Sequence, residues 1–293
     1  MLSAPNCLEV GNLGRNDVGK FLVLERAVFE TRIAECFSLF RELGVEPVMF
    51  KGWLAASNYP DGHRRQYADL DIAVSPSEFG IALKQLPELF RKKIPIDLHS
   101  GLRHLDTLPW DKFFDRCEIR GVQGVEIRVP CPEDHLRILC VHWLSDGGEY
   151  RERLWDIYYA VANRPPDFDW DKCLGCVSEI RREWVITCIG LAHKYLGLSI
   201  NDLPFKDEAQ YLPGWLTKFL ETEWKRTTRL IPLRLAAKRP RLLVGQIRKR
   251  FPPNPIQSIV DTESSVKRQF LLPVQMRGLL RRSRISIARA FGR

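Results

Sequence analysis

Hydrophobic residues recur with two different periods along the first part of the chain. Over residues 18–43 they return every three or four positions, which predicts a long amphipathic helix that stops at Gly44. The segments 45–50, 69–74 and 94–99 are short, and they are apolar or alternate with polar residues, as strands do. Helical segments separate these strands. The pattern therefore predicts a domain whose sheet is built from strands that alternate with helices.

Turn-forming residues mark where several of these segments begin or reverse. Ser75, three positions before Glu78, is expected to cap a helix after the second strand, because its hydroxyl can satisfy a free amide there. Pro95 in the third strand has no amide hydrogen, which favours an edge position or the start of a strand. Residues 118–129 predict a hairpin that turns at 121–124.

The rest of the chain has helical periodicity and divides by charge. Residues 225–293 hold 18 Lys and Arg and two acidic residues, whereas residues 1–224 hold 27 basic and 34 acidic ones. A proline-rich break after Phe251 splits the basic part into two arms. We therefore predict a sheet domain at residues 1–130, a helical domain at 131–224 and basic helical arms at 225–293.

The basic arms suit contact with a polyanion. Residues 279–289 have the pattern of a basic amphipathic helix, which is typical of helices that lie on anionic membranes. A solvated face packed on the sheet domain is the alternative that we favour slightly. Nucleic acid ranks third, since no aromatic residues interleave the basic run at 277–289.

The distribution of apolar residues also predicts where in the cell the protein lies. It has neither 18 consecutive apolar residues nor a basic start followed by an apolar run. We therefore expect a cytoplasmic protein without an integral membrane segment, with a peripheral membrane contact as the alternative.

Cysteine and histidine give weaker signals. The eight cysteines are scattered, most among apolar neighbours, which indicates reduced and buried thiols. Cys173 and Cys176 form a C-x-x-C motif, but no second pair lies at zinc-finger spacing, so we interpret them as core residues. His135 and His142 lie two helical turns apart, and we interpret them as partly buried helix residues rather than metal ligands.

Three aspartates are the strongest candidates for chemistry. Asp69 and Asp71 are two positions apart in a predicted strand, so they share one face while apolar residues line the other. Repulsion between two such carboxylates favours a bound cation, and Mg²⁺ prefers oxygen ligands. Asp97 lies among apolar residues of the next strand, where an unpaired charge is costly, and it can complete a two-metal centre. His99 is interpreted as facing away from Asp97, in a packing or supporting role.

A cationic turn precedes the aspartates. Lys51 and Gly52 connect a predicted strand to a helix start, where backbone amides and an ammonium group together suit phosphate binding. The turn and the three aspartates fall within 47 positions.

Several segments carry a resemblance to a known family. They are residues 50–55 (Phe-Lys-Gly-Trp-Leu-Ala), 59–61 (Tyr-Pro-Asp), Arg65 four positions before Asp69, 69–74 (Asp-Leu-Asp-Ile-Ala-Val), 96–99 (Ile-Asp-Leu-His), and the helical residues His142, Arg153, Leu154 and Asp156. In order and spacing they resemble the uncharacterised nucleotidyltransferases of the DNA polymerase beta-type superfamily. The resemblance spans residues 45–160. Its Lys-Gly turn replaces the Gly-Ser or Gly-Gly of the wider superfamily, as is typical of this subfamily.

The resemblance implies an α+β fold: a polymerase beta-like mixed sheet with helices, followed by a mainly helical C-terminal region. It also implies transfer of a nucleoside monophosphate from a nucleoside triphosphate to a hydroxyl acceptor, with release of pyrophosphate. The acceptor would be a small molecule, sugar, peptide or protein. Asp69, Asp71 and Asp97 would be catalytic and would hold Mg²⁺, as two ions, with Mn²⁺ as a substitute. Lys51 would contact the β or γ phosphate, and Gly52 would allow close backbone approach.

Two alternatives stay open at this point. Arg65 would either bind a phosphate or pair with Asp69 or Asp71. The alternative function is a non-catalytic nucleotide- or anion-binding protein, with a degenerate transferase fold and basic arms that contact membrane or nucleic acid.

Overall fold

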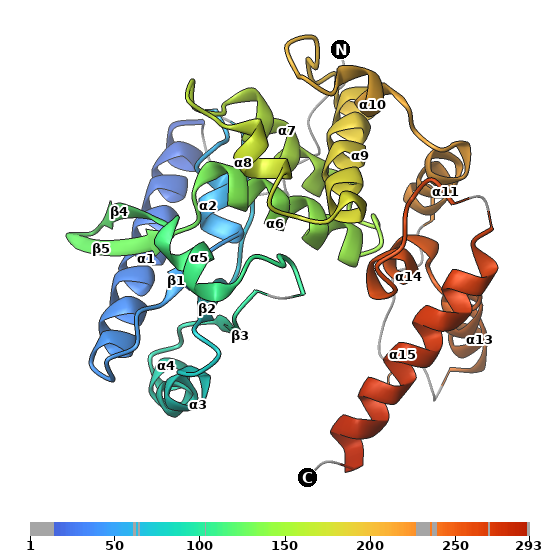
Figure 1. The fold of residues 1–293 in the computed structure, drawn as a ribbon. Helices are drawn as coiled ribbons and strands as arrows, with labels where there is room; N and C mark the ends of the chain where they lie inside the picture. The colour runs from blue at the N-terminus through green and yellow to red at the C-terminus, as the bar shows by residue number, and fades with distance from the viewer. Residues whose placement is uncertain are drawn as a thin grey trace. The chain divides into compact units, whose positions relative to one another are not determined.

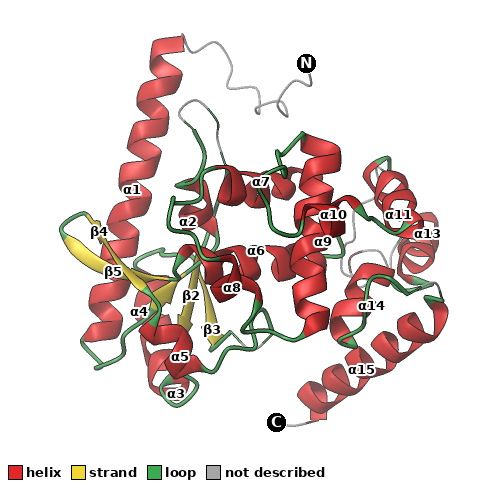
Figure 2. Ribbon diagram, turned by 45° about the horizontal axis from the view of Figure 1, so that its top comes forward, coloured by secondary structure: helices red, strands yellow, loops and turns green. Residues whose placement is uncertain are grey.

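The computed structural model describes residues 15–60, 63, 65–102, 104–226, 235, 239–268 and 270–291. The chain forms two compact units that divide between His135 and Leu136 (Figure 1). The first unit contains the sheet, and the regular elements described in the second unit are helices (Figure 2).

A five-stranded mixed sheet with the order β3-β2-β1-β5-β4 forms the centre of the first unit. Its strands are β1 (Val48–Met49), β2 (Leu70–Val74), β3 (Ile96–Ser100), β4 (Glu118–Val122) and β5 (Val125–Val129). β1 is antiparallel to β2 and parallel to β5, β2 and β3 are parallel, and β4 and β5 form an antiparallel hairpin. The α+β fold expected from the sequence is confirmed, and β3, which follows Pro95, lies at the edge as predicted.

Helix α1 (Arg15–Arg41) provides much of the core of this unit. Its side chains Phe37 and Phe40 are fully buried in one apolar cluster with Ile72 of β2 and Ile127 of β5. Shortly after the helix, Gly44 has a φ of 73°, a left-handed conformation that favours glycine and turns the chain toward β1. The predicted long amphipathic helix is therefore confirmed.

Short helices connect the strands of the first unit. They are α2 (Gly52–Ala56), α3 (Phe79–Ala82), a 3-10 turn (Leu83–Gln85), α4 (Leu86–Arg91) and α5 (Trp110–Asp115). The predicted hairpin turn is confirmed, because Gln123 and Gly124 have positive φ angles of 49° and 77°, as a tight two-residue turn requires.

The predicted serine cap of the helix after β2 is wrong. Glu78 is the residue that precedes α3, and the helix has no side-chain cap. The hydroxyl of Ser75 instead lies 2.7 Å from the hydroxyl of Ser77, so its hydrogen bond stays within the turn. The hydroxyl of Ser77 is therefore the partner of Ser75, in place of a free backbone amide at the helix start.

The second unit is a set of helices with well-defined ends. α6 (Pro132–Ser145) leads into it, and α7 (Leu154–Ala162), α8 (Trp170–Leu174), α9 (Glu179–Leu196), α10 (Lys206–Gln210) and α11 (Gly214–Trp224) follow. The carboxylate of Asp169 caps α8, and the hydroxyl of Ser178 caps α9. Trp143 and Trp184 are among its largest fully buried side chains.

The basic region continues as α13 (Pro240–Arg250), α14 (Pro255–Asp261) and α15 (Leu272–Phe291). The predicted break after Phe251 is confirmed, and Asn254 caps α14 by accepting hydrogen bonds from two backbone amides. Of the predicted amphipathic segment 279–289, the side chains beyond Arg284 lie outside the described residues. No helix in the described part of the chain is long and apolar enough to cross a membrane.

The cysteines and helix histidines behave largely as expected. The described cysteines are free thiols and most are buried, Cys173 among them, while Cys176 is half-buried. Cys7 lies outside the described residues. His142 is half-buried, whereas His135 is only 4% exposed and so is more deeply buried than the sequence indicated.

Candidate active site

Strand β2 places Asp71 at the centre of the site. Leu70, Ile72 and Val74 of this strand are buried in the apolar core, and Asp71 points to the other face. In the parallel pair formed by β2 and β3, Asp71 lies directly beside Asp97. The strand register therefore brings two carboxylates from separate segments onto one face of the sheet.

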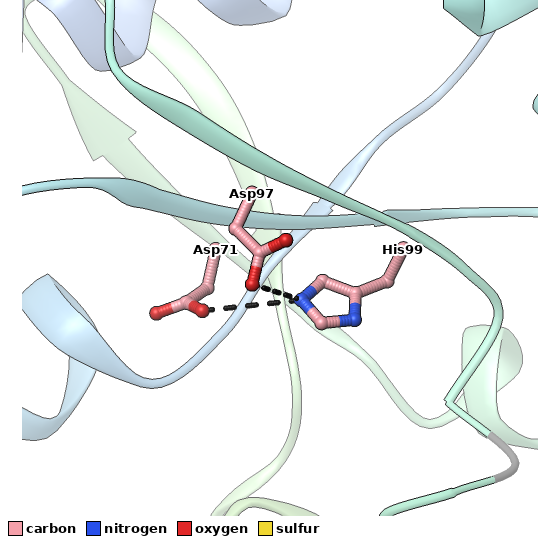
Figure 3. A group of neighbouring side chains, drawn as sticks. All are labelled: Asp71, Asp97 and His99. Carbon is pink, nitrogen blue, oxygen red and sulfur yellow. Dashed lines mark hydrogen bonds and ion pairs between the residues drawn. The ribbon is translucent and has the colours of Figure 1, made fainter. Parts of the chain in front are cut away.

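His99 joins these two carboxylates. Its Nε2 atom lies 3.0 Å from Oδ2 of Asp97 and 4.0 Å from Oδ1 of Asp71 (Figure 3). Among the described residues, Asp71, Asp97 and His99 form a group whose potential ligand atoms all lie within 4.8 Å of one another. A divalent cation fits a group with this spacing and these donors.

The interpretation that His99 faces away from Asp97 is wrong. Residues two positions apart on a strand share a face, and the register places His99 beside Ala73 on the side that carries the carboxylates. The environment predicted for Asp97 is also wrong, since its side chain is 56% exposed at the edge strand rather than enclosed by apolar residues.

Lys51 supplies a cation to the same site. Its Nζ atom lies 2.7 Å from Oδ1 of Asp71, and the two side chains are only 8% and 11% exposed. Lys51 has a φ of 57° and a ψ of −138°, a positive-φ conformation that costs a non-glycine residue about 1 kcal/mol or more. Its ammonium also lies 5.0 Å from the centre of the Phe50 ring. Because Lys51 adopts this conformation just before α2, its side chain is held on the carboxylate.

Gly52 leaves space beside Oδ2 of Asp71, because it has no side chain. A side-chain carbon placed at Gly52 would lie 3.6 Å from Oδ2 of Asp71 and 3.6 Å from the carbonyl oxygen of Asp69. This is an ordinary contact distance, so the glycine leaves open a space that any larger residue would occupy.

Burial shifts the pKa values of Asp71 and His99 in opposite directions. Burial raises the pKa of Asp71, and the charge of Lys51 opposes this rise while the charge of Asp69 adds to it. Burial lowers the pKa of His99, although Asp97 and Asp71 favour its charged form. His99 is therefore neutral near pH 7, with one ring nitrogen able to donate a hydrogen bond and the other able to accept one or to bind a cation.

Two aromatic neighbours fix the ring of His99. Phe50 meets it edge-on with ring centres 5.1 Å apart, and His104 stacks on it at 5.3 Å. His104 could not be predicted from the sequence, because no pattern in the loop after β3 marks it as a neighbour of the site.

The remaining predicted site residues lie around this group. Asp69 is exposed at a bend immediately before β2 and is not part of the group of close ligand atoms, although its charge acts on Asp71. Arg65 donates from Nη1 to the carbonyl oxygen of Gln66 at 2.7 Å, and its charge acts on the buried His135. Their roles as metal ligand and phosphate ligand stay predictions.

Comparison with known proteins gives one match. Residues 23–89 match the family model described as "Uncharacterised nucleotidyltransferase", and this segment contains Lys51, Gly52, Asp69 and Asp71. No curated protein and no solved structure matches the chain significantly. At the level of the family, the match supports a transferase. The resemblance to the uncharacterised nucleotidyltransferases is thus confirmed over residues 23–89.

Proposed function

We propose that this protein is a cation-dependent nucleotidyltransferase that moves a nucleoside monophosphate from a nucleoside triphosphate to a hydroxyl acceptor. The observation that carries the proposal is the convergence of Asp71, Asp97 and His99 beside the ammonium of Lys51. Two of these residues, Lys51 and Asp71, lie within the segment that matches the nucleotidyltransferase family.

The donor set fits a divalent cation. Asp71 is 11% exposed and its pKa is raised by burial, so its ionised form needs a positive partner, which the Lys51 ammonium provides in this structure. Two carboxylates suit Mg²⁺ or Mn²⁺, and the imidazole of His99 is tolerated better by Mn²⁺. Asp71 and Asp97 would hold the ion with Asp69 as a further ligand, or with Nε2 of His99 in place of its hydrogen bond to Asp97, and a second ion is part of the proposal. A bound cation supplies charge neutralisation for the triphosphate and lowers the pKa of the acceptor hydroxyl.

The residues of this chain have separate tasks in the transfer. The acceptor oxygen bonds to the α-phosphorus as the bond from this phosphorus to the bridging oxygen breaks, and pyrophosphate leaves with that electron pair. Asp97, which is exposed, accepts the proton of the acceptor hydroxyl, and His99 orients it through the 3.0 Å hydrogen bond. Lys51 moves from Asp71 to the β or γ phosphate, and Gly52 leaves room for the nucleotide beside Asp71. Arg65 is a further phosphate ligand in this proposal.

One observation favours the second candidate, a non-catalytic nucleotide- or anion-binding protein. Lys51 already satisfies Asp71 within the protein, at 2.7 Å and largely buried. A degenerate transferase site would use this ion pair as a structural contact, and its anion binding would need no cation.

The experiment that separates the two candidates uses Asp71→Asn and Asp97→Asn. Binding of each of the four nucleoside triphosphates is measured with and without Mg²⁺ or Mn²⁺, followed by pyrophosphate release and mass analysis of modified acceptors. We expect cation-dependent binding in the wild type and at least about a hundredfold loss of pyrophosphate release in either variant. Asp115→Asn, at an exposed position of α5, is the matched control.

Asp97→Asn separates a loss of activity from a loss of folding. Asp71→Asn leaves the buried ammonium of Lys51 without its carboxylate, which destabilises the first unit. Asp97 is 56% exposed, so its substitution has little structural cost. Nucleotide binding that needs no cation and survives both substitutions would support the non-catalytic candidate instead.

A further inference from the structure

Helix α15 exposes an apolar stripe that its packing does not use. Leu272, Met276 and Leu280 follow one another at four-residue intervals and are 60%, 37% and 59% exposed. Just before the helix, Phe270 is 81% exposed. We call these four residues the apolar stripe.

The opposite face of α15 is the one that packs. Val274 and Gln275 are buried, and a side-chain carbon placed at Gly278 would lie 3.0 Å from the side chain of Ser258 on α14. The helix is therefore already anchored within its own unit by a close, small-residue contact. Its stripe is not needed to hold it there.

The charged residues of α15 itself are all arginines. Arg277 and Arg284 are exposed on the same helix. The only two acids of residues 225–293 are already engaged, since Asp261 forms an ion pair with Arg282, and Glu263 forms one with Arg181 at 2.6 Å. The exposed surface near the stripe thus has cations in excess and few carboxylates to neutralise them.

Helix α13 repeats the pattern independently. Val244 and Ile247 are about half exposed, and Phe251 after the helix is 60% exposed, at spacings of three and four residues. The exposed Arg248 lies next to Ile247. Two helices of the basic region therefore combine exposed apolar residues with arginine.

We propose that the apolar stripe of α15 and its flanking arginines bind an anionic membrane surface, with the helix lying in the plane of the interface. Burying aliphatic side chains at the boundary of the acyl chains is favourable because it removes apolar surface from water. Arginine stems extend along the apolar surface and place their guanidinium groups at lipid phosphates. A nucleic acid could bind its phosphates to the arginines and stack one base on Phe270, but it gives little to the three aliphatic residues of the stripe, which stacking on aromatic rings does not use. The chemistry of the stripe thus favours a lipid surface over RNA or DNA.

The test is flotation of the full chain with vesicles of phosphatidylcholine alone or with phosphatidylserine added. We expect binding only to the vesicles with phosphatidylserine, and weaker binding as salt is raised. Leu272→Gln combined with Leu280→Gln should lower the partition coefficient at least about tenfold, since each leucine loses its burial in the interface. Glutamine is a good helix former, so the helix itself is retained.

The matched control is Leu24→Gln combined with Leu83→Gln, which makes the same change at leucines that are 64% and 43% exposed in the first unit. Vesicle binding that is absent, or equal in the stripe variant and the wild type, overturns the proposal. Equal RNA binding by both, without vesicle binding, would assign the surface to nucleic acid. Self-association that the stripe variant abolishes, again without vesicle binding, would assign it to a second copy of the chain. Asp97→Asn should bind vesicles normally, so this result does not depend on the proposed catalysis.

Discussion

At the scale of single residues, the proposed metal ion would compete with Lys51 for one oxygen of Asp71. The ammonium of Lys51 lies 2.7 Å from Oδ1 of Asp71, the position that a cation bound by Asp71 would need. Lys51→Met removes this competitor, so we predict that Mn²⁺ binds about tenfold more tightly without nucleotide, a gain of about 1.4 kcal/mol. Nucleotide affinity should fall in the same variant, because the phosphates lose a cation. Titration followed by electron paramagnetic resonance, with and without nucleotide, measures both effects.

Lys93 offers a matched control for this substitution. It is an exposed lysine that also has a φ of 57°, so Lys93→Met makes the same side-chain change at another positive-φ position, outside the group of Asp71, Asp97 and His99. If Lys51→Met leaves Mn²⁺ binding unchanged, or if Lys93→Met changes it equally, the competition does not exist.

The sequence identified the carboxylates more reliably than their neighbours. Asp71 and Asp97 could be predicted because an Asp-x-Asp strand and a second acidic strand are local patterns. Their contact depends on β2 pairing with β3 in one register, which is a tertiary fact that spacing does not encode. His99 could have been found, since its position two residues after Asp97 already places it on the same face. The loop residue His104 had no such signal.

At the scale of elements, local turn chemistry explains what could and could not be predicted. The β4–β5 hairpin could be predicted because glycine at its turn tolerates the required positive φ. The cap at Ser75 failed because a nearby hydroxyl, that of Ser77, offered an equally close partner. A helix cap predicted from one motif therefore fails where another hydrogen-bond partner lies equally near.

A buried ion pair joins α13 to α11, and its loss should be costly. Nζ of Lys249 lies 2.7 Å from Glu223, and the two side chains are 9% and 5% exposed; Glu149 lies 3.5 Å from the same nitrogen. Lys249→Met leaves Glu149 without this cation and leaves Glu223 with only the half-exposed Arg226, at 2.9 Å. We therefore predict a loss of about 3–5 kcal/mol in the unfolding free energy of the second unit. Urea unfolding followed by circular dichroism measures this loss.

The neighbouring Arg248 provides the control for that change. It is exposed, so Arg248→Met should alter the unfolding free energy by about 0.5 kcal/mol or less. Adding Glu223→Gln to Lys249→Met should recover part of the lost stability, because it removes one of the stranded charges. A small effect of Lys249→Met alone would mean that water reaches the pair in solution.

At the scale of the whole molecule, the charge division along the chain was visible in the sequence, and the sheet domain was predicted to end at residue 130, just before the helix in which the two units divide. Pro132 marks a helix start, and nothing in the sequence indicates that the units divide inside that helix, between His135 and Leu136. Whether a helix residue belongs to one core or the next depends on the side chains that surround it. The buried His135 is one such residue, and its environment controls how the protein responds to acid.

Burial, together with the smaller effect of the charges of Arg120 and Arg65, lowers the pKa of His135 to about 3. In the unfolded chain the same group titrates near 6.5, so the unfolded state binds more protons than the folded state between these two values. The contribution of His135 to stability is therefore full above about pH 6.5. It falls as the pH drops, by about 1.4 kcal/mol for each pH unit between the two pKa values.

His135→Leu cannot titrate and also removes a buried Nε2 atom that has no hydrogen-bond partner. We predict that this variant is as stable as the wild type at pH 7 and more stable at pH 5, whereas His63→Gln, at an exposed position, retains the wild-type slope. Hydrogen exchange of the first unit at both pH values measures the difference, and parallel slopes for His135→Leu and the wild type would mean that water or an anion reaches the imidazole in solution.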